Sequence, residues 1–298
     1  MEKYSRFRDE ATGIAPFQEA RPAPASAVQT GALYVLGAVA YPFCVVNLAI
    51  YFLVAKPLLP AALSRAVLNW LVLVPLRVLY VFLTYEGEHR ASVRQKLIRR
   101  AAPGDVLLSN FTSPLDPLVY ESRQKTWFVL PEGDRFAVAS TFGAMKRALS
   151  AQAPRAAAAA APRASLSEIT QAAAKSGAVV VLFVEGTPTN GRGLLTLKDL
   201  NVREIAEIET EVYAAALRYT PATATAPVPE TLLGFLWRLG HSSASYVASA
   251  RVSGQPIPKS ALQRAEISKA IGAIGRLRIL GDRLDRSAKE EYAALRKK

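Results

Sequence analysis

The longest apolar stretch of the chain lies near its N-terminus. Residues 31–55 form a run of 25 positions without a charged side chain. A helix of this length, at 1.5 Å per residue, reaches across a hydrocarbon core of about 30 Å. A second apolar run, residues 66–85, is interrupted by Pro75 and Arg77. The pattern predicts a membrane-associated helical hairpin over residues 28–85, and it leaves open whether the hairpin dips into one leaflet or makes two full spans.

Residues 1–27, which precede the hairpin, are polar, contain prolines and show no apolar period. Such a segment buries too little apolar surface to fold by itself, so we expect a flexible polar arm. The arm lacks the features of a cleaved signal peptide. An alternative interpretation makes the following helices the core of a soluble bundle, but 25 uncharged positions exceed what a buried soluble helix normally shows.

The pattern changes after residue 85, where short β-branched runs alternate with amphipathic segments. This alternation is typical of an α/β domain, which we expect to cover residues 86–298. Strands are expected at residues 106–109, 127–130, 136–139, 178–184, 212–219 and 245–252. Helices are expected at residues 92–101, from 116 onward, and at 166–175, 200–208, 232–239, 259–280 and 287–298. Residues 151–164, rich in alanine and bracketed by prolines, are predicted to be a low-complexity insertion.

The net charge and the cysteine and histidine content of the chain limit which binding partners are expected. The chain of 298 residues has a formal net charge of +13, but no basic face with interleaved aromatic residues is evident, so nucleic acid is not expected. An anionic membrane surface explains the charge better, although the basic segments could also be solvated helix faces. Cys44 is the only cysteine, which excludes an internal disulfide. Because the sequence contains no Cys/His clusters, we expect no metal site. We also expect the part of the protein that carries the chemistry to face the cytosol.

The loop that follows the strand at 178–184 carries candidate chemistry. Its turn-forming residues and a downstream arginine could direct N–H groups, hydroxyls and a guanidinium at one anion. A plain surface loop is the alternative. Glu185 lies where a buried strand opens, and a carboxylate there needs a partner, for which Arg192 is the expected residue.

Blocks of the sequence resemble, in order, the motifs of the glycerolipid acyltransferases. Residues 183–195 (FVEGTPTNGRGLL) look like the third, phosphate-binding motif, with valine for the usual proline. They are especially similar to its form in lysophosphatidylcholine acyltransferases and fungal lysophosphatidic acid:oleoyl-CoA acyltransferases. Residues 109–116 (SNFTSPLD) resemble the first motif, N-H-x-x-x-x-D, and residues 212–219 (VYAAALRY) resemble the fourth. Residues 141–147 (TFGAMKR) are the best match to the second. The resemblance covers roughly residues 85–295.

This resemblance implies a fold, an activity and a set of site residues. The implied fold is a mixed sheet flanked by helices. The implied activity is transfer of a fatty acyl group from acyl-CoA to a lysophospholipid, preferably lysophosphatidic acid, with acyl-CoA as co-substrate and no cofactor. Asp116 matches the aspartate that orients the catalytic histidine, and Asn110 and Ser113 belong to the same active-site turn. The residues that match the phosphate-binding block are Glu185, Gly186, Thr187, Asn190 and Arg192.

Phe111 stands at the position of the catalytic histidine, where its side chain would point into the cleft between Asp116 and the phosphate loop. A phenyl ring cannot accept a proton, and general-base catalysis contributes about 10² to 10⁴ in rate. Another base is one possibility, with His89 and His241 as the two histidines of the chain. Transfer without a strong base is the second, because a thioester is already activated and positioning lowers the barrier. The third is a catalytically degenerate domain that acts as a lipid-binding adaptor. In each case we expect the endoplasmic reticulum or a lipid droplet, with the domain in the cytosol.

Overall fold

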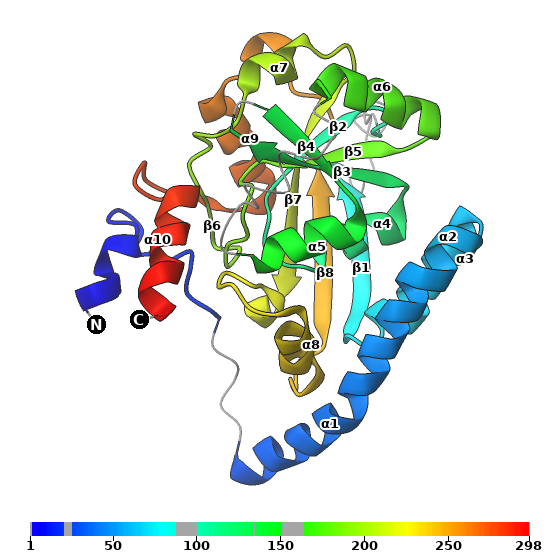
Figure 1. Cartoon of the computed structure of the whole chain (residues 1–298). Coiled ribbons are helices and arrows are strands. Elements are labelled where there is room, and N and C mark those ends of the chain that lie inside the picture. The colour runs from blue at the N-terminus through cyan, green and yellow to red at the C-terminus, as the bar shows by residue number, and fades with distance from the viewer. Residues whose placement is uncertain (1, 21–25, 88–99, 134, 151–163, 298) are drawn as a thin grey trace.

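A computed structural model of the whole chain describes residues 2–20, 26–87, 100–133, 135–150 and 164–297 (Figure 1). The helix expected at residues 92–101 and the insertion expected at 151–164 lie almost entirely outside these ranges. Four of the five basic residues that follow the apolar region, Arg90, Arg94, Lys96 and Arg99, also lie outside these ranges, whereas Arg100 is described.

A seven-stranded mixed sheet forms the centre of the fold, in the order β1-β8-β7-β2-β5-β3-β4. Its strands are β1 (Val78–Tyr85), β2 (Val106–Ser109), β3 (Thr126–Glu132), β4 (Arg135–Ala139), β5 (Val179–Phe183), β7 (Val212–Thr220) and β8 (Tyr246–Val252). The four strands β7, β2, β5 and β3 run parallel, while β8 and β4 are antiparallel to their neighbours β7 and β3. β1 pairs in parallel with β8 at the edge. The expected mixed α/β fold is confirmed.

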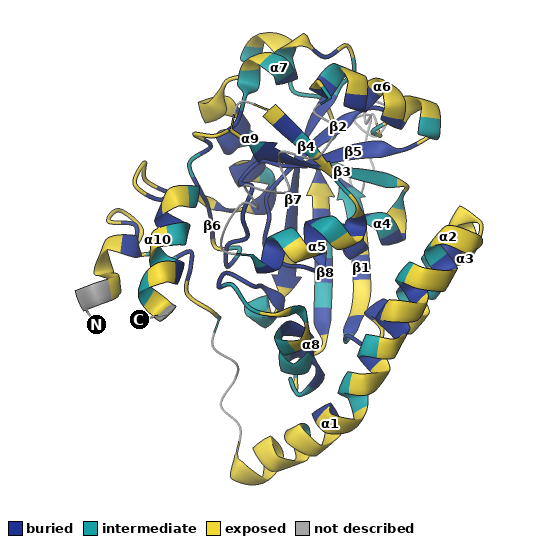
Figure 2. Cartoon of the chain, in the orientation of Figure 1, coloured by how far each residue is buried: buried dark blue, intermediate teal, exposed yellow. Residues whose placement is uncertain are grey.

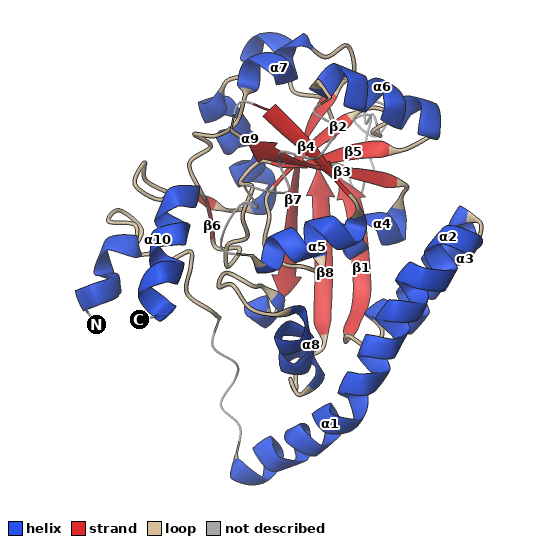
Figure 3. Ribbon diagram, in the orientation of Figure 1, coloured by secondary structure: helices blue, strands red, loops and turns tan. Residues whose placement is uncertain are grey.

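Helices cover both faces of this sheet (Figure 3). One face packs against α4 (Asp116–Arg123), α5 (Thr141–Leu149), α8 (Leu232–Gly240) and the N-terminal helices. The other packs against α6 (Leu166–Ser176), α7 (Val202–Glu207) and α9 (Arg264–Gly275). On β5, Val181 and Phe183 enter the first cluster of core residues, whereas Val180 and Leu182 enter the second. Since successive side chains of a strand point to opposite faces, a strand covered on both faces is apolar at every position.

α6 shows how local sequence delivers the chain into β5. The hydroxyl of Ser165 accepts a hydrogen bond from the backbone N–H of Glu168, whose carboxylate accepts in return from the N–H of Ser165. This capping box starts the helix. Gly177 ends it with a φ of 72°, a left-handed conformation that glycine adopts without strain. β5 begins two residues later.

The N-terminal helices form a hairpin that is shorter than expected. α1 (Ala27–Ile50) continues through the π-helical turn η2 (Tyr51–Ala55) into α2 (Lys56–Leu58), and the chain returns along α3 (Ala61–Val67) and a second π-helical turn, η3 (Leu68–Leu73). The expectation that the apolar run 66–85 belongs to the helical hairpin is therefore wrong for its last eight residues, which form β1. Arg77, with a φ of 61°, marks the break between the two conformations. β1 is apolar on both faces, so its alternation is hidden in the sequence.

The first twenty residues also differ from the expectation of a flexible arm. Residues 2–20, which we call the arm, begin with the 3₁₀ helix η1 (Glu2–Phe7) and pack against the C-terminal helix α10 (Arg286–Lys297). Figure 1 shows the two chain ends side by side. Phe7 and Phe17 are buried there against Tyr292 of α10. The arm lacks a periodic pattern because isolated aromatic residues, rather than a regular face, hold it in place.

The expected helix at residues 259–280 is also shorter in the structure. It consists of a 3₁₀ turn, η6 (Lys259–Ala261), followed by α9. Arg276, with a φ of 51°, ends α9, and Arg278–Ile279 then forms the short strand β9, which pairs with β6 (Gly193–Leu194). This pairing connects the C-terminal segment to the end of the loop at residues 184–192, which we call the phosphate loop after the motif that it resembles.

Candidate functional site

Three of the motif-like blocks meet at one edge of the sheet. β2, β5 and β7 are parallel neighbours, so their carboxyl ends lie together. The turn 110–116 follows β2, the loop 184–192 follows β5, and residues 217–219 end β7. Ligands of open α/β sheets bind outside the carboxyl ends of the strands. Topology therefore brings together residues that are far apart in the chain, such as Asp116 and Tyr219, which are 103 positions apart.

Asp116 is the centre of the turn after β2. Its side chain is fully buried and accepts hydrogen bonds from the backbone N–H groups of Thr112, at 2.6 Å, and Ser113, at 3.1 Å. The phenol of Tyr219, at the end of β7, donates a third at 2.8 Å. Burial raises the pKa of Asp116 from 3.8 to about 7, and these donors oppose the shift. Asp116 thus closes its own turn and joins it to the fourth block. Tyr219 was not selected from the sequence, where its one signal is its place at the end of that block.

Phe111 does not point into a cleft. Its ring has no exposed surface and stacks on Phe183 of β5, with 4.3 Å between the ring centroids. The backbone around it is also engaged, because its N–H donates to Glu185 and its carbonyl accepts from Thr189. The expectation that residue 111 faces the space between Asp116 and the phosphate loop is not met. A phenyl ring is stable here because the site is part of the hydrophobic core.

Glu185 is buried at the start of the phosphate loop, but Arg192 is not its partner. Its carboxylate accepts hydrogen bonds from the backbone N–H groups of Phe111, at 2.9 Å, and Leu195, at 3.0 Å. Arg192 is exposed, and within the described ranges it forms no ion pair with Glu185. Burial raises the pKa of Glu185 from 4.5 to about 8, while the positive charge of Lys289 opposes this shift. Glu185 therefore joins the first and third blocks through backbone contacts.

Lys289, in α10, is a second residue of the candidate site, besides Tyr219, that sequence reasoning missed. Its side chain is fully buried, and its ammonium donates to the carbonyl of Pro188 at 2.6 Å. Burial lowers its pKa from 10.5 to about 7, and Glu185 opposes the shift. In the sequence, Lys289 lies beside the apolar positions Ala288 and Tyr292 of an amphipathic helix. A lysine at that border normally extends its ammonium to water, so the pattern gives no sign of its burial.

The remaining turn residues hold the backbone together. Asn110 pairs twice with the backbone of Leu217, accepting from its N–H at 2.7 Å and donating to its carbonyl at 3.0 Å. The hydroxyl of Ser113 donates to the carbonyl of Ala224 at 2.7 Å. Both side chains are buried. A turn is present at the expected residues, and these two side chains shape it rather than face a ligand.

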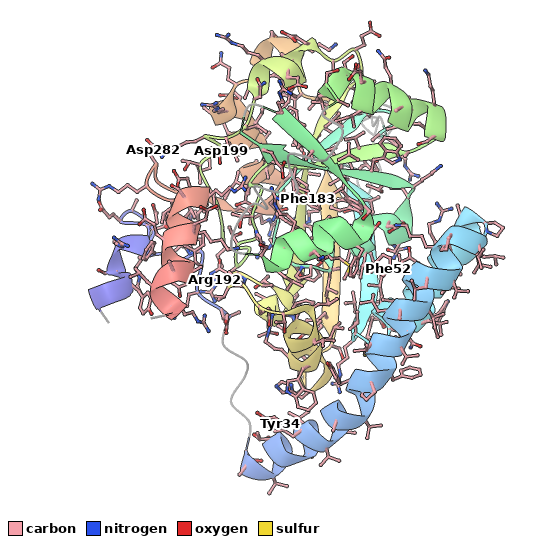
Figure 4. The ribbon with its side chains drawn as sticks, viewed as in Figure 1. Tyr34, Phe52, Phe183, Arg192, Asp199 and Asp282 are labelled. Atoms are coloured by element: carbon pink, nitrogen blue, oxygen red, sulfur yellow. The ribbon has the colours of Figure 1, made fainter. Side chains whose placement is uncertain are left out.

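Only part of the phosphate-binding block is free to bind a ligand. Gly186 has a φ of 62°, and a Cβ there would lie 3.2 Å from Pro131 of β3, so both conformation and space favour glycine. Thr187 is buried. Asn190 gives its side-chain amide to the arm, donating to the carbonyls of Ala15, at 2.8 Å, and Gln18, at 3.1 Å. Arg192 is exposed and lies on the side of the domain that carries α10 (Figure 4).

No histidine replaces the missing base in the described part of the site. His241 lies at the end of α8, where its ring stacks on Tyr34 of α1 at 5.1 Å and its Nδ1 contacts the carbonyl of Trp237 at 2.6 Å. It thus belongs to the contact between α8 and the hairpin. His89 lies outside the described residues. The described residues also include no group of three or more carboxylate, histidine or cysteine side chains able to hold a metal ion.

The fold and the site together define a mixed α/β domain in which blocks resembling three acyltransferase motifs converge. Comparison with known proteins agrees with this class. The chain is 27% identical, over 304 aligned residues, to a Schizosaccharomyces pombe protein named "Putative lysophosphatidic acid:oleoyl-CoA acyltransferase". The alignment covers all of this chain and 99% of the relative. No family model and no solved structure matches. The resemblance to the glycerolipid acyltransferases predicted from the motifs is therefore confirmed over the whole chain.

Proposed function

We propose that this protein is a membrane-bound acyl-CoA:lysophospholipid acyltransferase that converts lysophosphatidic acid to phosphatidic acid. The observation that carries the proposal is the convergence of the first, third and fourth blocks, joined through Asp116, Tyr219 and Glu185, at one sheet edge. The relative of similar length, whose name specifies lysophosphatidic acid and oleoyl-CoA, supports the choice of substrates.

The reaction requires an acceptor hydroxyl to attack the thioester carbon. A C–O ester bond forms, the C–S bond breaks, and the coenzyme A thiolate leaves and takes up the proton of the hydroxyl. Phe111 supplies no base, so in this proposal the chain acts mainly by binding and orienting both substrates, which can lower the barrier by several kcal/mol. The tie between Asp116 and Tyr219 and the burial of Glu185 would fix the turn and the loop in place for this purpose.

Membrane attachment is part of the proposal. The continuous helix from Ala27 to Leu58 has a mean hydropathy of 2.0 in its most apolar window, of which 28% is buried. Its outer face is largely exposed in Figure 2. Large apolar side chains exposed on the hairpin are Val35, Val39, Phe43, Val46, Leu53, Val54, Leu58, Leu63, Trp70 and Leu71. Such a continuous apolar face marks an interaction site, and a bilayer is the partner that its composition suits.

The geometry favours insertion into one leaflet over two full spans. The helix contacts the domain along its length: Gly37 lies against His241, Phe52 packs on Phe142 at 5.3 Å, and Lys56 pairs with Glu121 at 2.7 Å. A domain in water cannot contact a spanning helix in this way. The returning helix, residues 61–73, is about 20 Å long at 1.5 Å per residue, short of the roughly 30 Å needed. We place the protein on the endoplasmic reticulum or a lipid droplet, with its domain in the cytosol.

A second function remains open because of a specific observation. The Phe111 ring is packed into the core, and the carboxylate oxygens of Asp116 already accept hydrogen bonds from Thr112 and Tyr219. Both features are expected for a degenerate domain that serves as a lipid-binding adaptor. The test is turnover by purified full-length protein in nanodiscs, measured as coenzyme A release and phosphatidic acid formation from oleoyl-CoA and lysophosphatidic acid. Acceptor-dependent turnover supports the enzyme. Vesicle binding without turnover overturns it in favour of the adaptor.

A further inference from the structure

The arm is attached to the phosphate loop by direct backbone contacts. The N–H of Asn190 donates to the carbonyl of Pro16 at 2.9 Å, and its side-chain amide donates to two further arm carbonyls. Asp9 accepts from the N–H of Gly281 at 2.9 Å, which fixes the arm to the segment before α10. Beneath these contacts Phe7 and Phe17 are buried with Leu195, which directly follows the phosphate loop and β6. The arm therefore has a defined position relative to the loop.

A cavity of about 540 Å³ lies between the arm and the loop. Its lining includes Arg8 and Thr12 from the arm, and Asn190 and Arg192 from the loop. The volume is within the range of about 300 to 1,000 Å³ that is typical of small-molecule sites. Figure 4 shows Arg192 on the side of the domain where α10 lies, which agrees with this placement.

The charges that line the cavity are unbalanced. Arg8 and Arg192 are both exposed, and neither side chain has an ion pair or hydrogen bond to another described residue. The carboxylate that lines the same cavity, Glu19, is engaged at 3.1 Å by Arg296 of α10. Two guanidinium groups that share a cavity whose carboxylate is already paired with another arginine can bind an anion. A phosphate monoester suits it best, because its planar O–P–O edges accept paired hydrogen bonds from guanidinium groups.

We propose that the arm completes the anion site of the phosphate loop, with Arg8 binding the same phosphate monoester as Arg192. The inference rests on the proposed function for its choice of ligand, since two phosphate monoesters occur among the substrates: the headgroup of lysophosphatidic acid and the 3′-phosphate of coenzyme A. In the sequence, six residues separate the end of the arm at residue 20 from the hairpin, which begins at Ala27. Binding of the headgroup would therefore connect the hairpin to the site.

Binding of two soluble probes tests the inference without requiring turnover. Glycerol 3-phosphate represents the headgroup and adenosine 3′,5′-bisphosphate represents coenzyme A. Affinities are measured by calorimetry on full-length protein in detergent, with glycerol as the uncharged control. Arg8→Ala and Arg192→Ala should both lower the affinity for the same one of the two probes. The loss in each variant should be ten- to hundredfold, as expected for a charge-assisted hydrogen bond. The probe that loses affinity identifies the source of the phosphate.

Arg6 provides the matched control. It lies two positions from Arg8 on η1, is exposed and pairs with Glu291 at 3.3 Å, but it does not line the cavity. Arg6→Ala should bind both probes as the wild type does. If Arg8 and Arg192 contact the same phosphate, the double substitution should cost less than the product of the two single effects. An unchanged probe affinity in Arg8→Ala, or equal losses in Arg6→Ala and Arg8→Ala, would overturn the inference.

The two proposals can fail separately. Wild-type protein that binds glycerol 3-phosphate through Arg8 but transfers no acyl group would keep the inference and remove the enzyme. Protein that is active but indifferent to Arg8→Ala would keep the enzyme and remove the inference. Circular dichroism of each variant checks the fold, which should hold because the Arg8 side chain is exposed.

Discussion

The ammonium of Lys289 donates a hydrogen bond of 2.6 Å to the carbonyl of Pro188, and this contact joins the C-terminal helix to the middle of the phosphate loop. The lysine side chain is fully buried, and the negative charge of the Glu185 carboxylate favours the charged form of its ammonium. A buried ammonium is costly unless it is paired and hydrogen-bonded. The C-terminal helix therefore helps to hold the loop in its conformation.

Lys289→Met should lower the free energy of unfolding by about 2 kcal/mol, because it leaves the Pro188 carbonyl buried without its hydrogen-bond donor. Thermal or urea unfolding of the purified protein measures the change. Lys198→Met is the control, since Lys198 is 53% exposed and pairs with Asp285 at the surface. It should cost less than about 1 kcal/mol. Equal losses of unfolding free energy in the two variants would show that the contact between Lys289 and Pro188 does not stabilise the fold.

The stability of the protein should depend on pH through Glu185. Burial raises its pKa from 4.5 to about 8, so the folded protein retains a proton that the unfolded chain releases between these values. The free energy of unfolding therefore falls as pH rises through this window. Asp116, with its pKa raised to about 7, adds the same slope at lower pH. Lys289, with its pKa lowered to about 7, adds the opposite slope above that value.

We accordingly expect the Tm of the wild type to fall between about pH 5 and 7 and to level off between about pH 7 and 8. In Glu185→Gln, the Tm should fall less steeply than in the wild type between about pH 5 and 7. The comparison is between the two slopes, so a change in the Tm of the variant at a single pH does not affect it. Differential scanning calorimetry at several pH values provides the slopes. Parallel slopes in the two proteins would mean that Glu185 does not change its protonation on unfolding in this window.

Phe111→His should not create a catalytic base. The imidazole would lie in the hydrophobic core against Phe183, where no partner for its nitrogens is evident, so we expect a loss of roughly 2 to 4 kcal/mol in stability. Acyl transfer should stay at or below the wild-type rate. Phe111→Leu, which keeps the site apolar, separates the packing effect from that of the polar ring. A rise in activity of tenfold or more in Phe111→His alone would show that residue 111 does reach the substrates.

Charges on the outer face of the hairpin should release the protein from membranes. Val39 and Leu53 are 74% and 75% exposed, so arginine at both positions should leave the fold intact. Arginine in the hydrocarbon region costs about 2.5 to 3.5 kcal/mol per residue on insertion scales. Vesicle flotation and carbonate extraction measure the binding. Val138→Arg, at an exposed position on β4, is the control and should float as the wild type does.

The double variant should be recovered in the soluble fraction after carbonate treatment, while the wild type stays with the membrane. Salt at 1 M screens charge contacts but not apolar insertion, so it should not release the wild type. Release of the wild type by salt alone would exclude the inserted hairpin and leave the basic segments as the membrane contact.

The longer strands outside the apolar N-terminal region followed closely from the sequence. The strands expected at residues 106–109, 178–184, 212–219 and 245–252 are present within one or two positions of their expected ends. Turn residues, caps and short β-branched runs are local signals, and they agree here with the final fold. Residues 78–85 misled the prediction because β1 is apolar on both faces and continues the apolar run of the hairpin.

The sequence by itself determined the class of the domain, the order of its motif-like blocks and the apolar length of its first helix. Only the tertiary structure decided what those residues do. Phe111 is a core residue, Asn190 holds the arm, and Glu185 accepts backbone hydrogen bonds instead of pairing with Arg192. Whether a side chain is buried, and which residues it contacts, depends on segments that are distant in the sequence and meet only in the folded protein. A lysine on an amphipathic helix and an arm with two isolated phenylalanines give no local sign of such contacts, because the physical cause is the packing of the whole chain.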